Sequence, residues 1–126
     1  MTDVRLLPTE GEEQAMLFSW CEMRMRQYPE LELLFHIPNG GRRSKSEAAR
    51  FKSEGVKAGV PDMFLPVARG KYHGLFIEMK RLKGGRVQEV QRKWMEKLRG
   101  QGYYTTVCHG WQEASDALQR YLEGRL

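Results

Sequence analysis

The chain has 126 residues, a hydrophobic content of 40% and a formal net charge of +5 at pH 7. This length suits a single domain with one modest core, and we expect one domain over residues 1–126. The composition argues against disorder, no apolar run approaches the roughly 18 residues that span a bilayer, and no signal-peptide pattern is present. We therefore expect a cytoplasmic protein without a membrane partner. Cys21 and Cys108 are too few for a zinc site, so buried free thiols are expected.

The charge is unevenly spread. Residues 1–36 hold three basic and seven acidic side chains, whereas residues 42–57 hold six and two, and residues 80–99 hold eight and two. A basic zone attracts polyanions and releases their counterions on binding. Basic runs are often only solvated helix faces, but this zone brackets the acidic cluster described below. The combination favours a nucleic-acid partner.

A helix is predicted from an N-cap at Thr9 to about Gln27, where a Tyr-Pro pair ends it. Residues at i, i+4, i+7 and i+11 form one stripe of this helix, namely Glu10, Gln14, Leu17 and Cys21. The apolar half of the stripe must face the core, so Glu10 and Gln14 would point toward the end of the sheet. Ordinary solvent exposure of both is the alternative, and Glu13 is the rival to Glu10.

The next stretch predicts a short strand over residues 33–37, an abrupt loop and a basic helix. The loop runs Pro38-Asn39-Gly40-Gly41 and is followed by Arg42-Arg43, which would suit phosphate, although a plain turn explains it equally well. Ser44 and Glu47 form a capping box for a helix that closes at Gly55. His36 within a strand is more often a core histidine than a ligand.

Two neighbouring strands are predicted over residues 63–67 and 75–79, separated by a turn-rich segment. Pro61 restricts the backbone before the first of them and places Asp62 at its start. Strand side chains alternate, so Glu78 and Lys80 share one face while Met79 points the other way. An acid and a lysine on a mostly apolar strand are costly unless they have partners.

The C-terminal part predicts a helix over about residues 87–99, a strand over 103–108 and a helix over 111–122. Gln91 is the one polar residue on the apolar stripe of the first of these helices, which Val87, Trp94 and Leu98 complete, and it needs a hydrogen-bond partner. The element order is that of an α/β fold with one mixed sheet covered by helices.

Asp62, Glu78 with Lys80, and Glu10 with Gln14 are thus expected to meet at one place. Hard divalent cations prefer oxygen ligands, and Mg²⁺ commonly takes one or two carboxylates plus waters and substrate phosphate. These residue types suit metal-assisted phosphodiester hydrolysis, in which Lys80 would orient or deprotonate the attacking water. A simple salt bridge between Glu78 and Lys80 is the alternative.

Several motifs occur in the order found in one nuclease family. They are Pro8-Thr9-Glu10 with Gln14, His36 to Gly41, Gly59-Val60-Pro61-Asp62, Ile77-Glu78-Met79-Lys80, and Gln91 followed by Trp94. Pro61-Asp62 with Glu78-x-Lys80 resembles the PD-(D/E)xK nuclease signature, and the whole set resembles the virus-type replication-repair nuclease (VRR-Nuc) domain, from about Pro8 to Tyr121. The resemblance implies an α/β restriction-endonuclease-like (PD-(D/E)xK) core, with a mixed β-sheet of about four strands flanked by helices.

Small stand-alone members of that family, from phages or bacteria, are similar to archaeal-type Holliday junction resolvases. The resemblance therefore implies a homodimeric, Mg²⁺- or Mn²⁺-dependent endonuclease for branched DNA. It assigns metal binding to Asp62, Glu78, the Met79 carbonyl and Glu10, catalysis also to Lys80 and Gln91, and support to Gln14. DNA contacts are expected from Asn39, Gly40, Gly41, Arg42, Arg43, Lys45, Arg81, Lys83 and Arg86.

Two alternatives remain. One is a nuclease for flap, linear or single-stranded DNA. The other is a non-catalytic nucleic-acid-binding module that uses only the basic zone.

Overall fold

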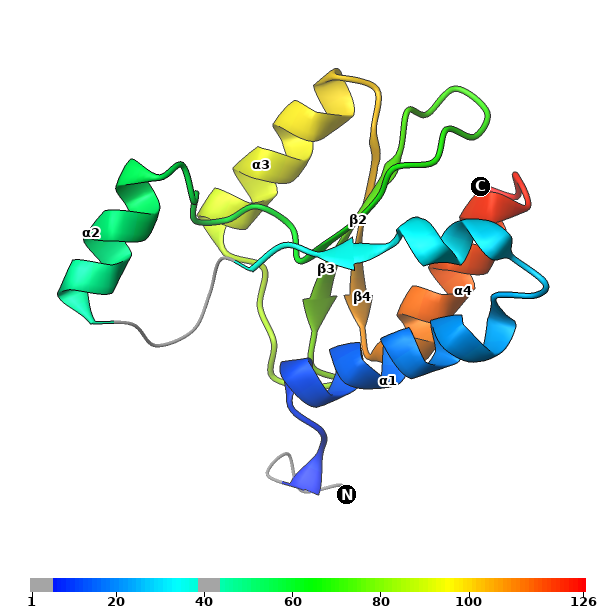
Figure 1. Cartoon of the computed structure of the whole chain (residues 1–126), viewed down its shortest axis with the longest axis horizontal. Helices are drawn as coiled ribbons and strands as arrows, with labels where there is room; N and C mark the ends of the chain where they lie inside the picture. The colour runs from blue at the N-terminus through cyan, green and yellow to red at the C-terminus, as the bar shows by residue number, and fades with distance from the viewer. Residues whose placement is uncertain (1–5, 39–43) are drawn as a thin grey trace.

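The computed structural model describes residues 6–38 and 44–126 (Figure 1). Its elements, in order, are α1 (Glu10–Arg24), the 3₁₀ helix η2 (Pro29–Leu33), β1 (Phe35–His36), α2 (Lys45–Ser53), β2 (Met63–Leu65), β3 (Leu75–Lys80), α3 (Glu89–Gly100), β4 (Tyr104–His109) and α4 (Trp111–Leu122). They form a mixed four-stranded sheet flanked by helices. The expected fold class is confirmed.

The sheet has the order β1-β2-β3-β4, with antiparallel pairing up to β3 and parallel pairing between β3 and β4. β3 is the longest interior strand, and all six of its residues are buried. Leu75, Ile77 and Met79 point into the main core, as the alternation predicted. Phe76 lies on the opposite face, where its ring stacks on Phe64 at 4.2 Å.

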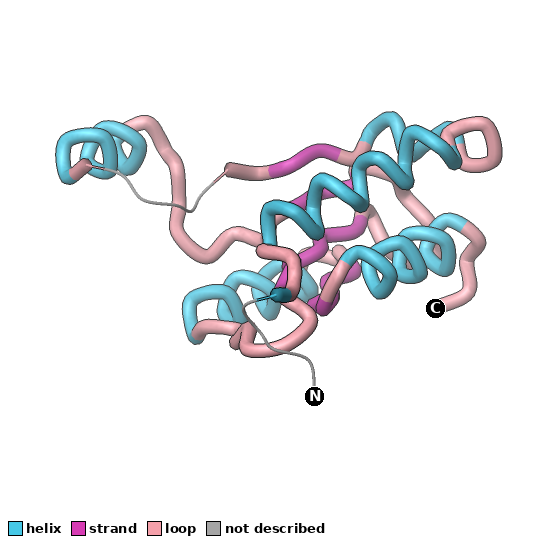
Figure 2. The backbone as a smooth tube through the Cα atoms, turned by 90° about the horizontal axis from the view of Figure 1, so that it is seen from below, coloured by secondary structure: helices cyan, strands magenta, loops and turns pink. Residues whose placement is uncertain are grey.

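Helices cover both faces of the sheet. Leu17 and Cys21 of α1 and Ala114, Leu118 and Tyr121 of α4 join the main core, so these two helices lie over the same face. α3 packs against β4 and reaches the face that carries Glu78 through Gln91. α2 stands apart from the body of the fold in both views (Figures 1 and 2).

The first helix and the first strand are shorter than predicted. α1 ends at Arg24 rather than Gln27, and residues 29–33 form a 3₁₀ helix, so only Phe35 and His36 remain as strand. Proline at the start of η2 favours a new helical turn, which converts the apolar run from strand to helix. β2 and β4 also differ from the predicted strands by one or two residues at their ends.

The predicted apolar stripe of α3 is only partly used. Met95 is the one buried residue of this helix, whereas Trp94 and Leu98 are half-buried and Val90 is 41% exposed. α3 makes its contacts with the sheet mainly through β4. The part of the stripe that does not face the sheet stays accessible to solvent.

Glu13 joins α1 to the start of α4. Its side chain is 1% exposed, and its Oε1 accepts a hydrogen bond from the Trp111 amide at 3.1 Å. Gly110 permits this approach, since its φ is +91° and a Cβ there would lie 2.6 Å from Leu82 Cδ2. Glu13 therefore supplies an acceptor to the first turn of α4, where helix amides have no partner within the helix.

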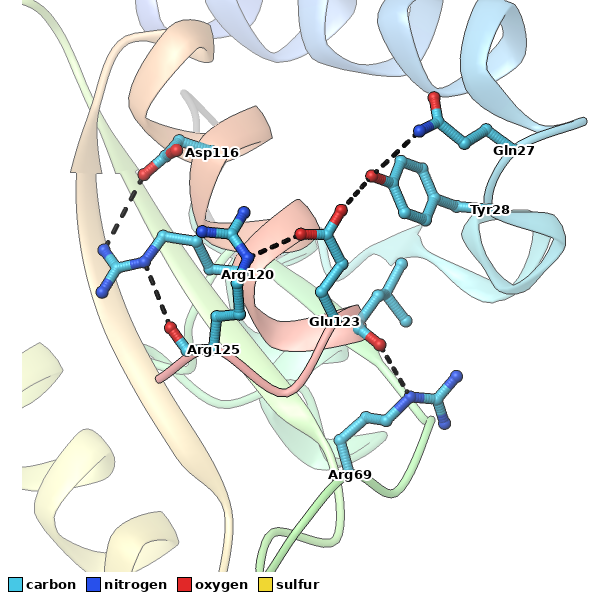
Figure 3. A network of polar contacts seen from close by, with 8 residues as sticks. Gln27, Tyr28, Arg69, Asp116, Arg120, Glu123 and Arg125 are labelled. Carbon is cyan, nitrogen blue, oxygen red and sulfur yellow. Dashed lines mark hydrogen bonds and ion pairs between the residues drawn. The ribbon is translucent and has the colours of Figure 1, made fainter.

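A polar network holds the end of α4 (Figure 3). Tyr28 donates to Glu123, which also accepts from Arg125 Nε at 2.6 Å. Arg69, from the connection between β2 and β3, donates from Nε to the Leu122 carbonyl at 3.1 Å. The network links three segments that are distant in sequence, and none of its residues lines the candidate active site. No helix in the described part of the chain is long and apolar enough to cross a membrane.

Loss of the Glu13 carboxylate should destabilise the fold. Glu13→Ala removes a buried side chain and leaves the partly buried Trp111 amide without its acceptor, so we expect the free energy of unfolding to fall by about 1–3 kcal/mol in urea titrations. Glu13→Gln keeps an oxygen acceptor and should lose less. Glu22→Ala, an exposed change on the same helix, is the matched control. Equal midpoints for Glu13→Ala and Glu22→Ala would contradict this role.

Candidate active site

The C-terminal end of β3 carries a buried acid and a buried lysine. Glu78 is 2% exposed and Lys80 is 5% exposed, and Lys80 Nζ lies 3.3 Å from Glu78 Oε2. The strand alternation places both side chains on the face opposite the main core. Burial of two charges is tolerated only with good partners, because the loss of hydration costs several kcal/mol per ion.

Asp62 reaches this strand from the start of β2. Its Oδ2 accepts a hydrogen bond from the Met79 amide at 2.7 Å, which holds the carboxylate beside β3. Its backbone carbonyl accepts from the Ile37 amide at 2.7 Å. Side chain and main chain of Asp62 are therefore both held.

The hydrogen-bond partner that the sequence predicted for Gln91 is Glu78. Its Nε2 donates to Glu78 Oε2 at 3.0 Å, and its Oε1 accepts from the Gln88 amide at 2.9 Å. The glutamine thus uses both ends of its amide, one to hold the acid and the other to cap the first turn of α3. Glu78 Oε2 is shared between Gln91 and Lys80.

The other oxygen of Glu78 has no partner among the described residues. Glu78 Oε1 is buried and accepts no hydrogen bond. Burial, followed by the neighbouring charge of Asp62, raises the pKa of Glu78 to about 8, and Lys80 opposes this shift. An acid in this state lacks a positive charge or a donor on its free side.

A pocket of about 230 Å³ opens beside Asp62 and Met79, and neither Glu78 nor Lys80 is among its lining residues. Its lining comes from α1, the end of β1, the start of β2 and the end of β3, through Glu10, Gly11, Gln14, His36, Pro38, Asp62 and Met79. The structure thus brings Glu10 and Gln14 to the same cavity as Asp62, as expected from the α1 stripe. Glu13, the alternative to Glu10, does not line this pocket and instead accepts a hydrogen bond from the first residue of α4.

The residues present fit a divalent cation that shares its coordination with solvent and substrate. In the described part of the chain, no three His, Cys, Asp or Glu side chains lie close enough to hold a metal by themselves. Asp62 and Glu78 nevertheless supply the one or two carboxylates that Mg²⁺ commonly takes. The unpartnered Glu78 Oε1 is the observation that favours such an ion.

His36 belongs to this site rather than to the core. It is exposed, lines the pocket, and its Nδ1 lies 2.9 Å from the Asp62 carbonyl. A carbonyl only accepts, so Nδ1 carries the proton of this hydrogen bond. The interpretation of His36 as a core histidine is wrong, because β1 is an edge strand and both of its residues are exposed.

The expected DNA contacts have different positions. Arg81 donates to the carbonyls of Leu7 and Pro8, each at 3.2 Å, and so holds the segment before α1. Lys45, Lys83 and Arg86 are exposed. Asn39, Gly40, Gly41, Arg42 and Arg43 lie outside the described residues.

The comparisons with known proteins agree with this arrangement. The VRR-NUC domain model matches residues 9–112, which include Glu10, Asp62 and Glu78. The chain belongs to the VRR-NUC family. A solved structure described as a VRR_NUC domain protein has 34% sequence identity and a TM-score of 0.78, over 92% of this chain and 89% of that one. No curated protein matches the chain.

Membership of the VRR-NUC family places the chain in a nuclease superfamily. Asp62, Glu78 and Lys80 stand where the PD-(D/E)xK motif requires them, at the starts and ends of adjacent strands. The structure adds what the motif does not state, namely that Gln91 and Lys80 hold the same oxygen of Glu78.

The raised pKa of Glu78 predicts a pH-dependent stability. Its ordinary value is 4.5 and its folded value about 8, so between these pH values the folded protein keeps a proton that the unfolded chain has lost. Stability of the metal-free protein should therefore fall as pH rises through this window. Glu78→Gln cannot ionise at this position and serves as the reference. Relative to it, the free energy of unfolding of the parent should fall by more than about 1.4 kcal/mol, the equivalent of one pKa unit, between acidic and mildly alkaline pH.

Urea titrations of both proteins in chelator measure this difference. Glu22→Gln, an exposed acid on α1, should follow the parent at every pH. Parallel stability curves for the parent and Glu78→Gln would show that Glu78 ionises normally in the fold.

Proposed function

We propose that the protein is a metal-dependent DNA endonuclease selective for branched DNA such as a four-way junction, with Mg²⁺ or Mn²⁺ as cofactor. The buried and unpartnered Glu78 Oε1 beside Asp62 carries the proposal. An acid pair without a cation would repel phosphate, whereas an acid pair with a cation attracts it. The basic zones on either side of the pair support a polyanionic substrate.

The protein residues have separable roles. Asp62 and Glu78 hold the cation, with the Met79 carbonyl at the strand end and Glu10 on the far side of the pocket. A bound divalent cation polarises the phosphoryl oxygen and lowers the pKa of a coordinated water. Lys80 orients the attacking water and stabilises charge that develops on the phosphate.

Three residues position the catalytic groups. Gln91 holds Glu78 through Oε2, which would leave Oε1 for the cation, and the Met79 amide holds Asp62 through Oδ2. Gln14 lines the pocket one turn after Glu10 and supports it there. Lys45, Lys83, Arg86 and the segment 39–43 contact the DNA backbone in this proposal.

Cleavage should depend on Asp62 and Lys80. Asp62→Asn and Lys80→Ala should each reduce the rate at least about 100-fold, because each removes a group that acts on the transition state. Junction affinity in chelator should stay near that of the parent. Urea titration should show that both variants are folded, with a lower midpoint for Lys80→Ala because that change removes one partner of a buried ion pair. Lys71→Ala, an exposed lysine between β2 and β3, is the control. Equal cleavage by Lys80→Ala and the parent would overturn the assignment.

The same assay tests substrate class. A four-way junction, a flap, a plain duplex and a single strand of shared sequence are digested with Mg²⁺, with Mn²⁺ and in chelator. Fastest cleavage of the junction supports the proposal, whereas preference for the flap, duplex or single strand assigns a different nuclease role. Tight, salt-sensitive binding without any metal-dependent product identifies a non-catalytic module.

We also propose a homodimer, since two symmetric cuts require two related active sites. The outer face of α1 offers an apolar surface, in which Met16 is 42% exposed, Met23 is 79% exposed and Trp20 lies between them. Exposed apolar side chains grouped on one helix face are typical of contacts between proteins.

Sedimentation at micromolar concentration tests the dimer. The parent should sediment at twice 14.7 kDa. A Met16→Lys, Met23→Lys double variant should sediment as a monomer, because it buries two charges in the contact. Gln112→Lys, which adds a lysine on α4, should remain dimeric. A parent that sediments only as the 14.7 kDa species contradicts the dimer.

A further inference from the structure

A second pocket adjoins the candidate active site. It measures about 350 Å³, and its lining is mainly apolar, formed by Ile37, Pro38, Gly55, Val56, Lys57, Val60 and Trp94. Pro38 also lines the active-site pocket, so the two cavities share a wall. We call this second cavity the Trp94 pocket.

A close contact between backbone segments builds the Trp94 pocket. Gly59 has a φ of +89°, and a Cβ there would lie 2.7 Å from Val90 Cγ2 and 3.0 Å from the Val90 backbone. The segment before Asp62 therefore lies directly on α3, which only glycine permits at this position. Trp94 follows Val90 by one helical turn and forms the α3 side of the pocket.

Both walls continue into the segments that hold the catalytic acids. Val60 precedes Asp62 by two residues, about 7 Å along an extended chain. Trp94 follows Gln91 by three residues, about 5 Å along the helix, and Gln91 holds Glu78. The Trp94 pocket is thus built on the same two segments that carry Asp62 and the glutamine that holds Glu78.

The chemistry of the Trp94 pocket suits a nucleobase. A base has two apolar faces and an attached phosphate, and the pocket offers an indole ring, aliphatic side chains and one cation, Lys57. Residues 42–57, which end at this pocket, carry six basic and two acidic side chains. A second protein chain would need a contact area of about 800 Å² per partner, far more than a cavity of this size provides.

We propose that the Trp94 pocket takes a nucleobase that has left the DNA stack beside the phosphodiester cut by the active site. The inference rests on the proposed endonuclease function and explains its selectivity. Extraction of a base costs least where pairing and stacking are already broken. Branch points provide such bases, and a continuous duplex does not.

A double-mutant cycle that combines Trp94 variants with abasic DNA tests the contact between Trp94 and the base. Junctions are prepared with either a normal base or an abasic residue at each nucleotide that flanks the mapped cut. On normal DNA, Trp94→Leu should lower kcat/KM by about 5- to 150-fold, the range of one base–aromatic stack. Trp94→Phe keeps a ring and should lose much less. At one flanking position, the abasic residue should lower the kcat/KM of the parent by a similar factor. On that abasic junction, the parent and Trp94→Leu should then have the same kcat/KM.

Cross-linking gives a second readout that does not need cleavage. Asp62→Asn is bound to junctions that carry 5-iodouracil at single positions near the branch, irradiated, and mapped by mass spectrometry. We expect the cross-link at Trp94, with Trp20 and Trp111 of the same protein as internal controls. A cross-link confined to Trp20 or Trp111 overturns the inference. The inference also fails if, at every flanking position, the kcat/KM losses from Trp94→Leu and from the abasic residue are independent, so that their factors multiply.

The two proposals fail in different ways. If the parent cuts no DNA with Mg²⁺ or Mn²⁺, the endonuclease function fails. If the parent cuts DNA but base and Trp94 act independently, only the nucleobase pocket fails. Conversion of a dimer to a monomer by Trp94→Leu would assign the pocket to a second copy of the chain and would also overturn it. Urea titration confirms that each variant is folded.

Discussion

The burial of Glu78 at the end of β3 is the constraint on which the rest of the site depends. A carboxylate that is 2% exposed is costly in isolation, so neighbouring elements must supply partners for it. Lys80 comes from the same strand and Gln91 from α3, and both use Oε2. The fold therefore satisfies one oxygen of Glu78 and leaves the other without a hydrogen-bond partner, while the nearby charge of Asp62 raises the pKa of Glu78 further. Such an arrangement is unfavourable for structure alone but suits a site completed by a cation.

β1 is short, and the described contacts of β1 and the residue after it are with β2 and the backbone of Asp62. Its two residues pair with β2, and the chain just after them supplies the Ile37 amide to the Asp62 carbonyl at 2.7 Å. His36 adds a second hydrogen bond to the same carbonyl at 2.9 Å. Pro61 restricts the backbone on the other side of Asp62. A two-residue strand thus fixes the backbone of one acid, while the Met79 amide fixes its side chain.

Local patterns predicted the parts of the site that depend on local physics. Strand alternation separated Glu78 from Met79, and the polar interruption of an apolar helix stripe identified Gln91 as a residue that needs a partner. The partner of Gln91 and the role of Glu13 could not be predicted in this way, because each depends on a contact between elements far apart in sequence. Glu13 looks like any first-turn acid until Gly110 brings the Trp111 amide to it. The partial exposure of Trp94 was missed for a related reason, since the stripe predicts an apolar face but not which part of that face the sheet covers.

In the proposed function, the distribution of charge would couple binding to catalysis. Basic segments on either side of the acids in sequence would attract DNA over a distance, whereas Asp62 and Glu78 would repel the phosphate that must approach closest. Without a cation, DNA would bind around the site while the reactive phosphate stays out of it. A cation between the acids removes that repulsion and at the same time favours the ionised form of Glu78, whose pKa is raised in its absence. Cation binding would therefore neutralise the acids and allow the phosphate to bind between them. Cation binding and productive DNA binding should each strengthen the other.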